Sequence, residues 1–452
     1  MITHPDRSFL GPIPTSWETI PLRRCLKEQC AGDWGDEYGE TTLGVLRSTN
    51  FTDSREVDYS DVAQRGFSST DAQHFILRKA DILVERSGGG PSQPVGRIVV
   101  LDRDLSGFAF TNFVQLLRVD PEVMNPDFVA WCLYQLHASG IVERLQHQTT
   151  QMRNLDYRDY LTIHLPKPSP EVQSAIVEVI QRTADAIRAA KSEVEKARQM
   201  RSSLLQQFFA KGLPGRHTRF KKTKIGEVPE EWDTPPLHLL AEIEAGIALN
   251  QDRAPRSNSY QYLTVVNVQR GCITIDEPRY MELNVSEVPK KLLQEGDIVV
   301  VEGHADSGEI GRAAMVSEEQ AGLSFQNHLF RLRLTDNTIL NKFLLCALNS
   351  ECARRHWSAI CNTSSGLNTI NRRQLRRLTV PRPKRDEQET LLKLLTAAET
   401  AIQKTETKYT ALERMKQSLL QNLLTGHIRL RDARTAANDG SEAPRLLVEA
   451  VG

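Results

Sequence analysis

The chain has 452 residues, carries 57 basic and 57 acidic side chains, and has a mean hydropathy of −0.40. This composition excludes a largely disordered, collagen-like or disulfide-dense protein, and the length allows two or three domains. The balanced charge excludes a uniformly basic nucleic-acid binder. Two acid-free basic runs, 198–224 and 372–385, nevertheless predict a polarised charge distribution.

The expected compartment follows from three absences. No apolar run approaches the ~18 residues that a membrane span needs. Residues 1–14 show no basic segment followed by an apolar one, as a secretory signal would. The seven cysteines include no Cys-x-x-Cys pair, which favours reduced thiols over disulfides or a zinc site. We therefore expect a cytoplasmic protein without membrane contact.

The first half of the chain begins with short strands and continues with helices. Runs rich in β-branched residues predict strands at 81–85, 96–102 and 113–119. Asn125 is a suitable N-cap and Pro126 a suitable first residue for a helix that extends to about His137. A second, much longer helix is predicted from Glu171 to about Ala210, because no proline or glycine interrupts that segment.

The second half follows the same order. Strands are predicted at 297–302 and 328–334, a helical segment at 337–350, and a long helix after the proline-rich residues 381–387. Each long helix stops before a glycine, Gly212 or Gly426. The tail, 429–452, is expected to be mostly disordered.

A shift of about 215 residues aligns the sequence with itself. The aligned pairs share one offset across the whole unit, which chance matches do not. They include Pro14 and Trp17 with Pro229 and Trp232, Gly96 and Arg97 with Gly311 and Arg312, Asn112 with Asn327, Gln173 with Gln388, and Met200 with Met415. Residues 41–78 and 250–290 do not align. Each half thus combines a shared frame with a dissimilar insert.

Heptad spacing along the long helices indicates coiled-coil pairing. The spaced residues are Ile180, Ile187 and Val194; Thr183, Ala190, Ala197 and Leu204; Leu395, Ile402 and Tyr409; and Ala398, Thr405, Leu412 and Leu419. A 40-residue helix is ~60 Å long at 1.5 Å per residue. Two interpretations stay open: the helices staple a two-domain protein together, or, as their equal lengths favour, they act as a ruler between two antiparallel-linked domains.

The predicted fold class is α+β. Two mixed α/β domains are separated by two long antiparallel coiled-coil helices, with an internal pseudo-two-fold repeat. The predicted segments are 1–168 (first recognition domain), 169–212 (first long helix), 213–383 (second recognition domain), 384–428 (second long helix) and 429–452 (tail).

Motifs of catalysis are missing. The chain has no GxxxxGK[ST] loop, and its histidines lack the HExxH or Cys/His spacing of metal sites. Asn125–Phe128 faintly resembles a motif of adenine methyltransferases, but the helix cap explains it. Glu406–Lys408 resembles a nuclease ExK motif but falls on a coiled-coil helix. The chain is therefore predicted to bind rather than to react, with no catalytic or metal-binding residues.

Four loops carry the side chains that read base edges or hold phosphates. They are 86–97, 146–154, 266–271 and 362–368, although each taken singly could be an ordinary solvated loop. The candidate DNA-binding residues are Arg86, Ser87, Gly88, Gly89, Gln93, Arg97, Gln148, Thr149, Arg153, Asn267, Gln269, Arg270, His304, Arg312, Thr363, Ser364, Ser365 and Asn368.

With these motifs in place, the chain resembles the DNA-specificity (HsdS) subunits of Type I restriction–modification systems. The resemblance covers about residues 10–428. It rests on IPTSW and VPEEW at the start of each half, on DILVERSGGGPSQPVGR and SSGLNTINRRQLRRLTVPRPKRDEQ, and on the closing SLLQQFFAKG and SLLQNLLTG. The first copy has Val172 where the second has Glu387, and we expect this departure to matter little.

The resemblance implies a non-catalytic subunit that binds double-stranded DNA. It implies that each recognition domain reads one half of a bipartite target, and that the helices set the gap and dock two adenine-methyltransferase (modification) subunits. Restriction/translocase subunits would complete the enzyme, and AdoMet, ATP and Mg²⁺ would belong to those partners. The proposed docking residues are Met200, Leu204, Leu205, Phe208, Met415, Leu419, Leu420 and Leu423.

Two other function classes remain open from the residues alone. One is a nuclease or methyltransferase with duplicated domains, which AdoMet binding or metal-dependent cleavage by the purified chain would reveal. The other is a coiled-coil scaffold that binds only protein, which sequence-independent behaviour in a DNA mobility-shift experiment would support.

Overall fold

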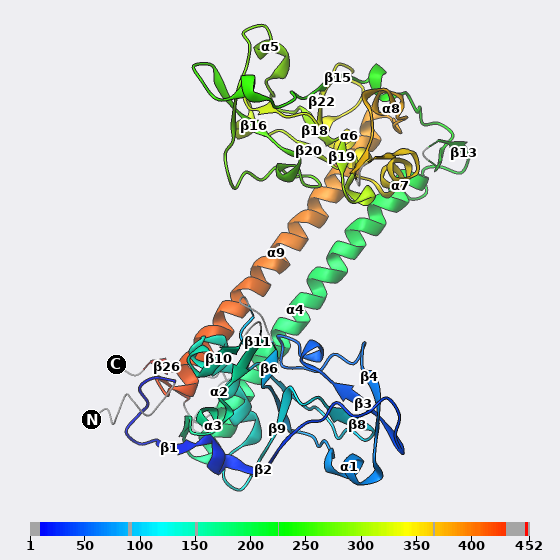
Figure 1. Cartoon of the computed structure of the whole chain (residues 1–452). Coiled ribbons are helices and arrows are strands. Elements are labelled where there is room, and N and C mark those ends of the chain that lie inside the picture. The colour runs from blue at the N-terminus through cyan, green and yellow to red at the C-terminus, as the bar shows by residue number, and fades with distance from the viewer. Residues whose placement is uncertain are drawn as a thin grey trace, which may run out of the picture. The chain divides into compact units, whose positions relative to one another are not determined.

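The computed structural model describes residues 10–88, 93–149, 152–224, 226–364, 367–430 and 448–450. The chain divides into two compact units (Figure 1). Unit 1 comprises Met1–Ala190 and Lys408–Gly452, and unit 2 comprises Lys191–Thr407. Two long helices, α4 (Pro170–Lys211) and α9 (Arg385–Leu424), contribute residues to both units. Each unit combines helices with small sheets, so the fold is α+β, as the sequence predicted.

The other elements of unit 1 occur in the following order. They are β1 (Glu18–Pro21), β2 (Leu26–Ala31), β3 (Thr41–Leu46), β4 (Ala63–Phe67), α1 (Ser69–His74), β5 (Ile82–Glu85), β6 (Ser87–Gly88), β7 (Ile98–Val100), β8 (Phe108–Phe110), β9 (Val114–Val119), α2 (Pro126–Ala138), β10 (Gln146–Thr149), β11 (Met152–Leu155), α3 (Tyr157–Tyr160), β12 (His164–Lys167), β25 (Ile428–Leu430) and β26 (Val448–Ala450).

The other elements of unit 2 follow the same plan. They are β13 (Phe220–Thr223), β14 (Gly226–Pro229), β15 (Ala241–Ala245), β16 (Ser259–Leu263), β17 (Tyr280–Glu282), α5 (Val288–Lys291), β18 (Ile298–Val301), β19 (Gly303–His304), β20 (Ala313–Met315), β21 (Ser324–Phe325), β22 (Leu329–Leu334), α6 (Asn341–Leu348), α7 (Glu351–Ile360), β23 (Asn362–Ser364), β24 (Leu367–Thr369) and α8 (Arg372–Arg377).

The strands predicted from the sequence correspond to β5, β7, β9, β18 and β22, and the predicted helices correspond to α2, α4, α6 and α9, so these predictions are confirmed. Asn125 caps α2, because its side-chain oxygen accepts hydrogen bonds from the backbone N–H groups of Asp127 and Phe128. Gly212 and Gly426 both have positive φ angles, 72° and 69°, just after the long helices. That left-handed conformation is the usual helix stop and is readily adopted by glycine.

The central sheet of unit 1 has the strand order β2-β9-β5-β7, with every neighbouring pair antiparallel. Strand side chains alternate between the two faces of a sheet. Ile82 and Val84 of β5 therefore belong to the core formed with α2, whereas Leu83 belongs to a second core on the other face. Because both faces are covered, Ile82, Leu83 and Val84 form a continuous hydrophobic run before the buried Glu85.

The central sheet of unit 2 has the order β15-β22-β18-β20, again entirely antiparallel. The flanking sheets also correspond in order and direction. β4-β3-β8 in unit 1 and β17-β16-β21 in unit 2 each join one antiparallel and one parallel pair. The pairing of β1 with β12 in unit 1 has its counterpart in two isolated bridges, Asp233 with Arg382 and Pro236 with Thr379, in unit 2.

Each central sheet contains a buried arginine–aspartate pair at the same place. In unit 1, Arg118 Nε and Nη2 donate to the two carboxylate oxygens of Asp81 at 2.8 and 2.7 Å. In unit 2, Arg333 makes the same two bonds to Asp297 at 2.8 and 2.7 Å. Both aspartates are buried and also accept a backbone N–H bond three residues upstream. Such bidentate pairs fix geometry as well as contributing energy.

A buried glutamine fastens the first turn of each long helix to its unit. Gln173 accepts a bond from the backbone N–H of Asn125 (2.9 Å) and donates to the carbonyl of Pro168 (2.8 Å). Gln388 accepts from Leu340 (2.9 Å) and donates to Pro383 (3.0 Å) and Thr338 (2.9 Å). One side chain therefore connects the cap of α2 or α6 with the proline-rich entry to α4 or α9.

The residue that precedes the buried glutamine differs between the two long helices, and in α9 it is Glu387. Its buried carboxylate accepts bonds from Trp232 Nε1 (3.1 Å), His217 Nε2 (2.9 Å) and the backbone N–H of Leu213 (3.2 Å). The equivalent Val172 is 37% exposed. Glu387 therefore joins three segments of unit 2, whereas unit 1 has Val172 at the equivalent position.

Within each unit, the segments of α4 and α9 run antiparallel. In unit 1, Ile176, Val179 and Ile180 share a core with Leu420, Leu423 and Leu424. In unit 2, Phe208 and Phe209 share a core with Leu391 and Leu395, and Arg201 pairs with Glu399 at 2.7 Å. Most predicted heptad positions are buried or half-buried in this way, but Leu204 is 38% exposed.

These cores correct part of the predicted docking surface. Phe208, Leu420 and Leu423 are buried among residues of their own units, so they stabilise the chain itself and cannot also contact a partner. Leu205 and Leu419 are half-buried against the same cores. Met200, Leu204 and Met415 are exposed on the helices.

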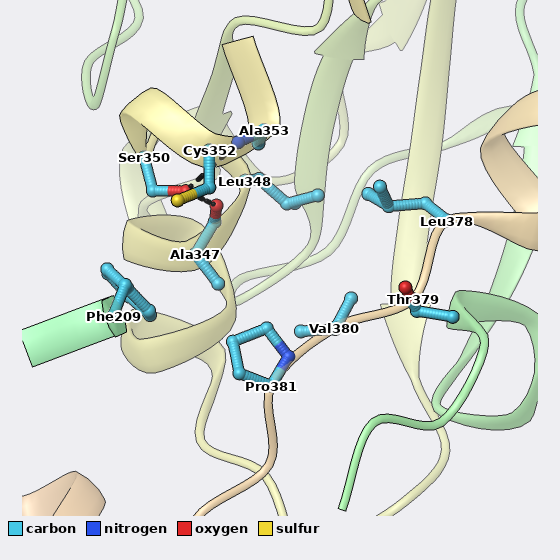
Figure 2. A pocket seen from close by; sticks show the side chains of 10 residues that line it. All are labelled: Phe209, Ala347, Leu348, Ser350, Cys352, Ala353, Leu378, Thr379, Val380 and Pro381. Carbon is cyan, nitrogen blue, oxygen red and sulfur yellow. Dashed lines mark hydrogen bonds between the residues drawn. The ribbon is translucent and has the colours of Figure 1, made fainter. Parts of the chain in front are cut away.

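A small apolar cavity lies in unit 2 between the end of α4, the turn from α6 to α7 and the residues that precede α9 (Figure 2). Phe209, Leu348, Val380 and Pro381 line it, and Ser350 turns its hydroxyl to the carbonyl of Ala347 (2.7 Å). Its volume is about 20 Å³. That is room for about one water molecule, so the cavity is a packing gap rather than a ligand site.

Most of the predicted disordered tail, 429–452, lies outside the described residues. The described part departs from the prediction, because β25 and β26 pair antiparallel, with Ile428 opposite Ala450 and Leu430 opposite Val448. No helix in the described part of the chain is long and apolar enough to cross a membrane.

Candidate nucleic-acid interface

In unit 1, two of the predicted recognition loops meet in one small sheet. Its order is β10-β11-β6, with Gly88 opposite Arg153 and Ser87 opposite Asn154. Gln148 pairs with Arg153 across the hairpin. Residues that the sequence placed in separate loops, 86–97 and 146–154, are thus neighbours on one surface.

The corresponding sheet of unit 2 is β19-β24-β23. His304 lies opposite Asn368, which in turn lies opposite Thr363. Asn368 also donates its side-chain N–H to the carbonyl of Ala305 (2.8 Å). The loop that contains His304 and the hairpin 362–368 are therefore brought together, in the same strand order as in unit 1.

A capped turn follows each of these small sheets. Asp156 accepts a bond from the backbone N–H of Asp159 and caps α3, and this bond, with His147 nearby at 3.3 Å, holds the pKa of Asp156 below its usual value. In unit 2, Asn371 caps α8 by accepting from Gln374. The caps fix the direction in which the chain leaves the hairpin.

Several predicted contact residues lie on or beside the small sheets. Arg86 is half-buried, with its guanidinium 5.6 Å from the ring centre of Tyr157, and Gln93 is exposed. Burial, partly offset by Arg86, raises the pKa of the Tyr157 hydroxyl well above its usual value. Gly89, Ser365 and the side chains of Gln148, Thr149, Thr363 and Ser364 lie outside the described residues.

The structure turns three predicted arginines inward. Arg97 donates to both carboxylate oxygens of the buried Glu85 (2.8 and 3.1 Å) and to the carbonyl of Ser48. This carboxylate raises the pKa of Arg97. Arg312 is buried against Glu309 (3.1 Å) and the carbonyl of Val265 (2.8 Å). Arg270 donates to the carbonyl of Gly308. Their hydrogen-bonding groups hold the insert to the frame, so we leave them out of the interface.

Two further predicted residues do not join the small sheet of unit 2. Asn267 accepts from the backbone N–H of Thr264 (2.8 Å) in a capping box, and Gln269 donates to the carbonyl of Val266 (2.8 Å). Both stabilise the turn that follows β16. Neither reaches the hairpin 362–368 through a described contact.

The predicted site residues do not include Glu302, Phe113 or His328. These three residues lie where the central strands end and the small sheets begin. The backbone N–H of Glu302 donates to the carbonyl of His328 (2.7 Å), and the N–H of Arg86 donates to that of Phe113 (2.7 Å). The signal was present, since Asn112 and Asn327, the residues before Phe113 and His328, align in the repeat. Burial raises the pKa of Glu302, and His328 opposes this rise.

No group of three or more His, Cys, Asp or Glu side chains in the described residues could hold a metal ion. What the two small sheets do offer is a set of hydrogen-bond donors and acceptors on partly exposed strands, the chemistry of base and phosphate contacts.

A model of the Type I restriction modification DNA specificity domain matches residues 229–414. The putative specificity subunit of the MjaX enzyme of Methanocaldococcus jannaschii is 20% identical over 432 residues, which cover 94% of this chain and 96% of that protein. The StySPI specificity subunit of Salmonella potsdam is 22% identical over 434 residues, covering 92% of this chain and 90% of its own. These matches support the assignment of the chain to the HsdS family of Type I DNA-specificity subunits.

Solved structures agree on the fold of this chain. A structure described under complex assembly and conformational transition of the type I R-M system has a TM-score of 0.62 at 14% identity and covers 92% of this chain and 99% of its own. The S subunit from M. genitalium has a TM-score of 0.50 at 13% identity, covering 91% and 96%. The family model and the curated specificity subunits thus support the family predicted from the sequence.

Proposed function

We propose that each unit of this HsdS subunit reads one half of a bipartite double-stranded DNA target, through its small sheet and its adjoining insert. The observation that carries the proposal is the equivalence of the two frames. Both have the same three sheets in the same strand order, yet residues 41–78 and 250–290, which supply two strands of the flanking sheet in each unit, do not align in sequence. Equal frames with unlike inserts suit two readers of unlike half-sites.

The boundaries of the two readers are also part of this proposal. We assign residues 1–168 and 213–383 to the recognition domains, and 169–212 and 384–428 to the long helices, as two copies of one ancestral unit related by a pseudo-two-fold. The 215-residue offset and the matching buried glutamines, Gln173 and Gln388, support the assignment.

The experiment that tests the proposal exchanges one insert at a time. Replacing residues 41–78 with those of a related HsdS chain, in complex with its methyltransferase subunits, should change one half-site of the methylated sequence and leave the other intact. Replacing residues 250–290 should change only the other half-site. Single-molecule mapping of methylated adenines reads both outcomes. A change in both half-sites from either exchange would contradict the proposal.

We further propose that the long helices dock two adenine-methyltransferase subunits and set the gap between the half-sites. Restriction/translocase subunits would join this core, and AdoMet, ATP and Mg²⁺ would be held by the partners. Helices of 42 and 40 residues, each with an exposed methionine at the equivalent place, Met200 and Met415, support the proposal. Methionine side chains are frequent at protein-binding surfaces because their flexible thioether adapts to the shape of a partner.

Docking can be tested on those methionines. Met200→Asp or Met415→Asp should each displace one methyltransferase subunit, which analytical ultracentrifugation or native mass spectrometry would show as a loss of half the bound partner. Gln403→Asp, an exposed change of equal charge on α9, is the matched control. Lengthening both helices by four residues should widen the tolerated gap by roughly 6 Å of rise or less. Unchanged partner binding and an unchanged gap would count against these roles.

A further inference from the structure

One position has opposite charge in the two units. Arg86 and Glu302 occupy the same backbone frame, because each donates its N–H to the residue after the repeated asparagine, Phe113 or His328, at 2.7 Å. The carbonyl of each residue also accepts a backbone hydrogen bond from the end of the central strand of the small sheet. Leu155, the last residue of β11, donates to Arg86 (2.8 Å), and Ile370, which follows β24, donates to Glu302 (2.9 Å).

The frame places both side chains at the root of the small sheet. Arg86 directly precedes β6 and Glu302 directly precedes β19. Each lies beside a partly exposed ring: Phe113 is 41% exposed, and the His328 side chain is 42% exposed. A polar group at this place is therefore available to a ligand that lies on the small sheet.

Neither side chain is fully engaged by the fold. Arg86 stacks over Tyr157, but its guanidinium makes no hydrogen bond or ion pair with any residue that the structure describes. Glu302 uses only Oε2, which accepts the backbone N–H of His328 at 3.1 Å and lies 3.7 Å from the His328 ring. Within the described ranges, Oε1 accepts no hydrogen bond.

Neighbouring charges do not remove this difference. The position of Tyr157 in unit 1 is occupied in unit 2 by Arg372, which could have neutralised Glu302. Arg372 instead donates to the carbonyl of Ile243 and lies 3.6 Å from Glu244. By contrast, Arg97 in unit 1 is fully used by Glu85 and the backbone. The unused donors of Arg86 and the unused acceptor of Glu302 thus remain as two opposite recognition groups.

Base edges distinguish between such groups. In the major groove, an arginine pairs with the two acceptors of guanine, whereas a carboxylate accepts from an exocyclic amino group, as on cytosine. A carboxylate next to a guanine edge would leave both sets of acceptors unpaired, which is unfavourable. A donor at one position and an acceptor at its equivalent therefore select different bases.

We propose that Arg86 and Glu302 are equivalent specificity-determining residues with opposite preferences. Arg86 reads the acceptor edge of a guanine in one half-site, and Glu302 reads an exocyclic amino group of a base in the other. This inference rests on the proposed function, since it assigns a base contact to each reader.

The test uses the subunit in complex with its methyltransferase partners and two variants, Glu302→Ala and Arg86→Gln. A randomised library of target duplexes gives the preference at every base pair. Glu302→Ala removes the proposed acceptor and should reduce discrimination at one base pair of one half-site by roughly tenfold to a hundredfold, the usual value of one base-reading pair. Arg86→Gln should do the same in the other half-site only.

A second arm is independent of how the variants fold. A duplex that lacks the exocyclic amino group at the affected position should bind the unaltered complex roughly tenfold to a hundredfold more weakly than the normal duplex does, whereas the Glu302→Ala complex should bind the two duplexes equally. Equal penalties for both complexes, or uniform weakening at all base pairs, would overturn the inference. If the insert exchanges change the two half-sites separately but these variants leave base preference unaltered, only this inference fails. If the exchanges themselves fail, the proposed function fails.

Discussion

Units 1 and 2 share one frame but stabilise the start of their long helices differently. In unit 2, a buried carboxylate, Glu387, collects hydrogen bonds from Trp232, His217 and the backbone of Leu213. In unit 1, the equivalent Val172 is partly exposed, and Gly426 instead lies against Pro14 and Trp17. The same architecture therefore tolerates a polar or an apolar junction, provided that every buried donor finds an acceptor.

The contacts that do not vary are the ones on which both frames depend. The arginine–aspartate pairs and the glutamine bridges occur in both units. The two hydrogen bonds from arginine to aspartate measure 2.8 and 2.7 Å in each unit. Positions beside the small sheets, such as the half-buried Arg86 and Glu302, differ in charge. The fully buried polar contacts are thus kept while partly exposed positions diverge, because an unpaired charge destabilises the fold more strongly the more completely it is buried.

The largest expected effect comes from removing one partner of the shared buried pairs. Arg118→Ala should destabilise unit 1, and Arg333→Ala unit 2, by roughly 3–5 kcal/mol, because a buried carboxylate loses its partner. Native-state hydrogen exchange measures each unit separately, which a single unfolding midpoint does not. Arg103→Ala, which breaks the exposed pair with Asp102, is the control and should change stability little. Equal losses in both units from one substitution would show that the frames are not independent.

Exchanging the residues at the start of the two long helices, Glu387 in unit 2 and Val172 in unit 1, should change the stability of the two units unequally. Glu387→Val leaves several buried donors of unit 2 unpaired and should destabilise that unit by roughly 3 kcal/mol. Val172→Glu adds a carboxylate at a partly exposed site of unit 1 and should change its stability by less than about 0.5 kcal/mol. Hydrogen exchange at the first turns of α4 and α9 is the measurement. A neutral Glu387→Val substitution would mean that the carboxylate is dispensable.

The glutamine bridges should give a smaller and more symmetric effect. Gln173→Ala and Gln388→Ala each leave a buried backbone N–H, of Asn125 or Leu340, without its acceptor, at a cost of roughly 1–3 kcal/mol. Gln388 makes one more bond than Gln173, so its loss should be the larger. Differential exchange at the first turns of α2 and α6 compares the two, with the exposed Gln403→Ala as control. The reverse order would argue that hydrogen bonding does not control these junctions.

The smallest effect is expected at the turn before the central strands. Ala80 has a φ angle of 67°, and the equivalent residue in unit 2 is Gly296, with φ of 82°. The left-handed conformation is strained by roughly 1–2 kcal/mol for alanine but not for glycine. Ala80→Gly should therefore stabilise unit 1 by up to about 1 kcal/mol after the entropy of glycine is subtracted. Gly296→Ala should do the opposite in unit 2, and stabilisation there would contradict this account.

The sequence by itself determined the features that depend on neighbouring residues. The Asn125 cap, the glycines after both long helices, the apolar central strands and the 215-residue alignment needed only local patterns, because capping, chain reversal and side-chain periodicity act within a few residues. The family could be predicted for the same reason, since its motifs are short and occur in a fixed order.

The tertiary structure alone decided which of the predicted residues are available. Arg97 and Arg312 are of the residue type that reads bases, but carboxylates of their own units and the carbonyls of Ser48 and Val265, far away in the chain, hold them inward. Phe208 and Leu423 have the pattern of docking residues, but they complete cores built from other parts of the chain. Glu302 entered the candidate site only through contacts with His328 and Ile370. Burial and charge pairing join residues far apart in the chain, and local periodicity carries no information about such partners.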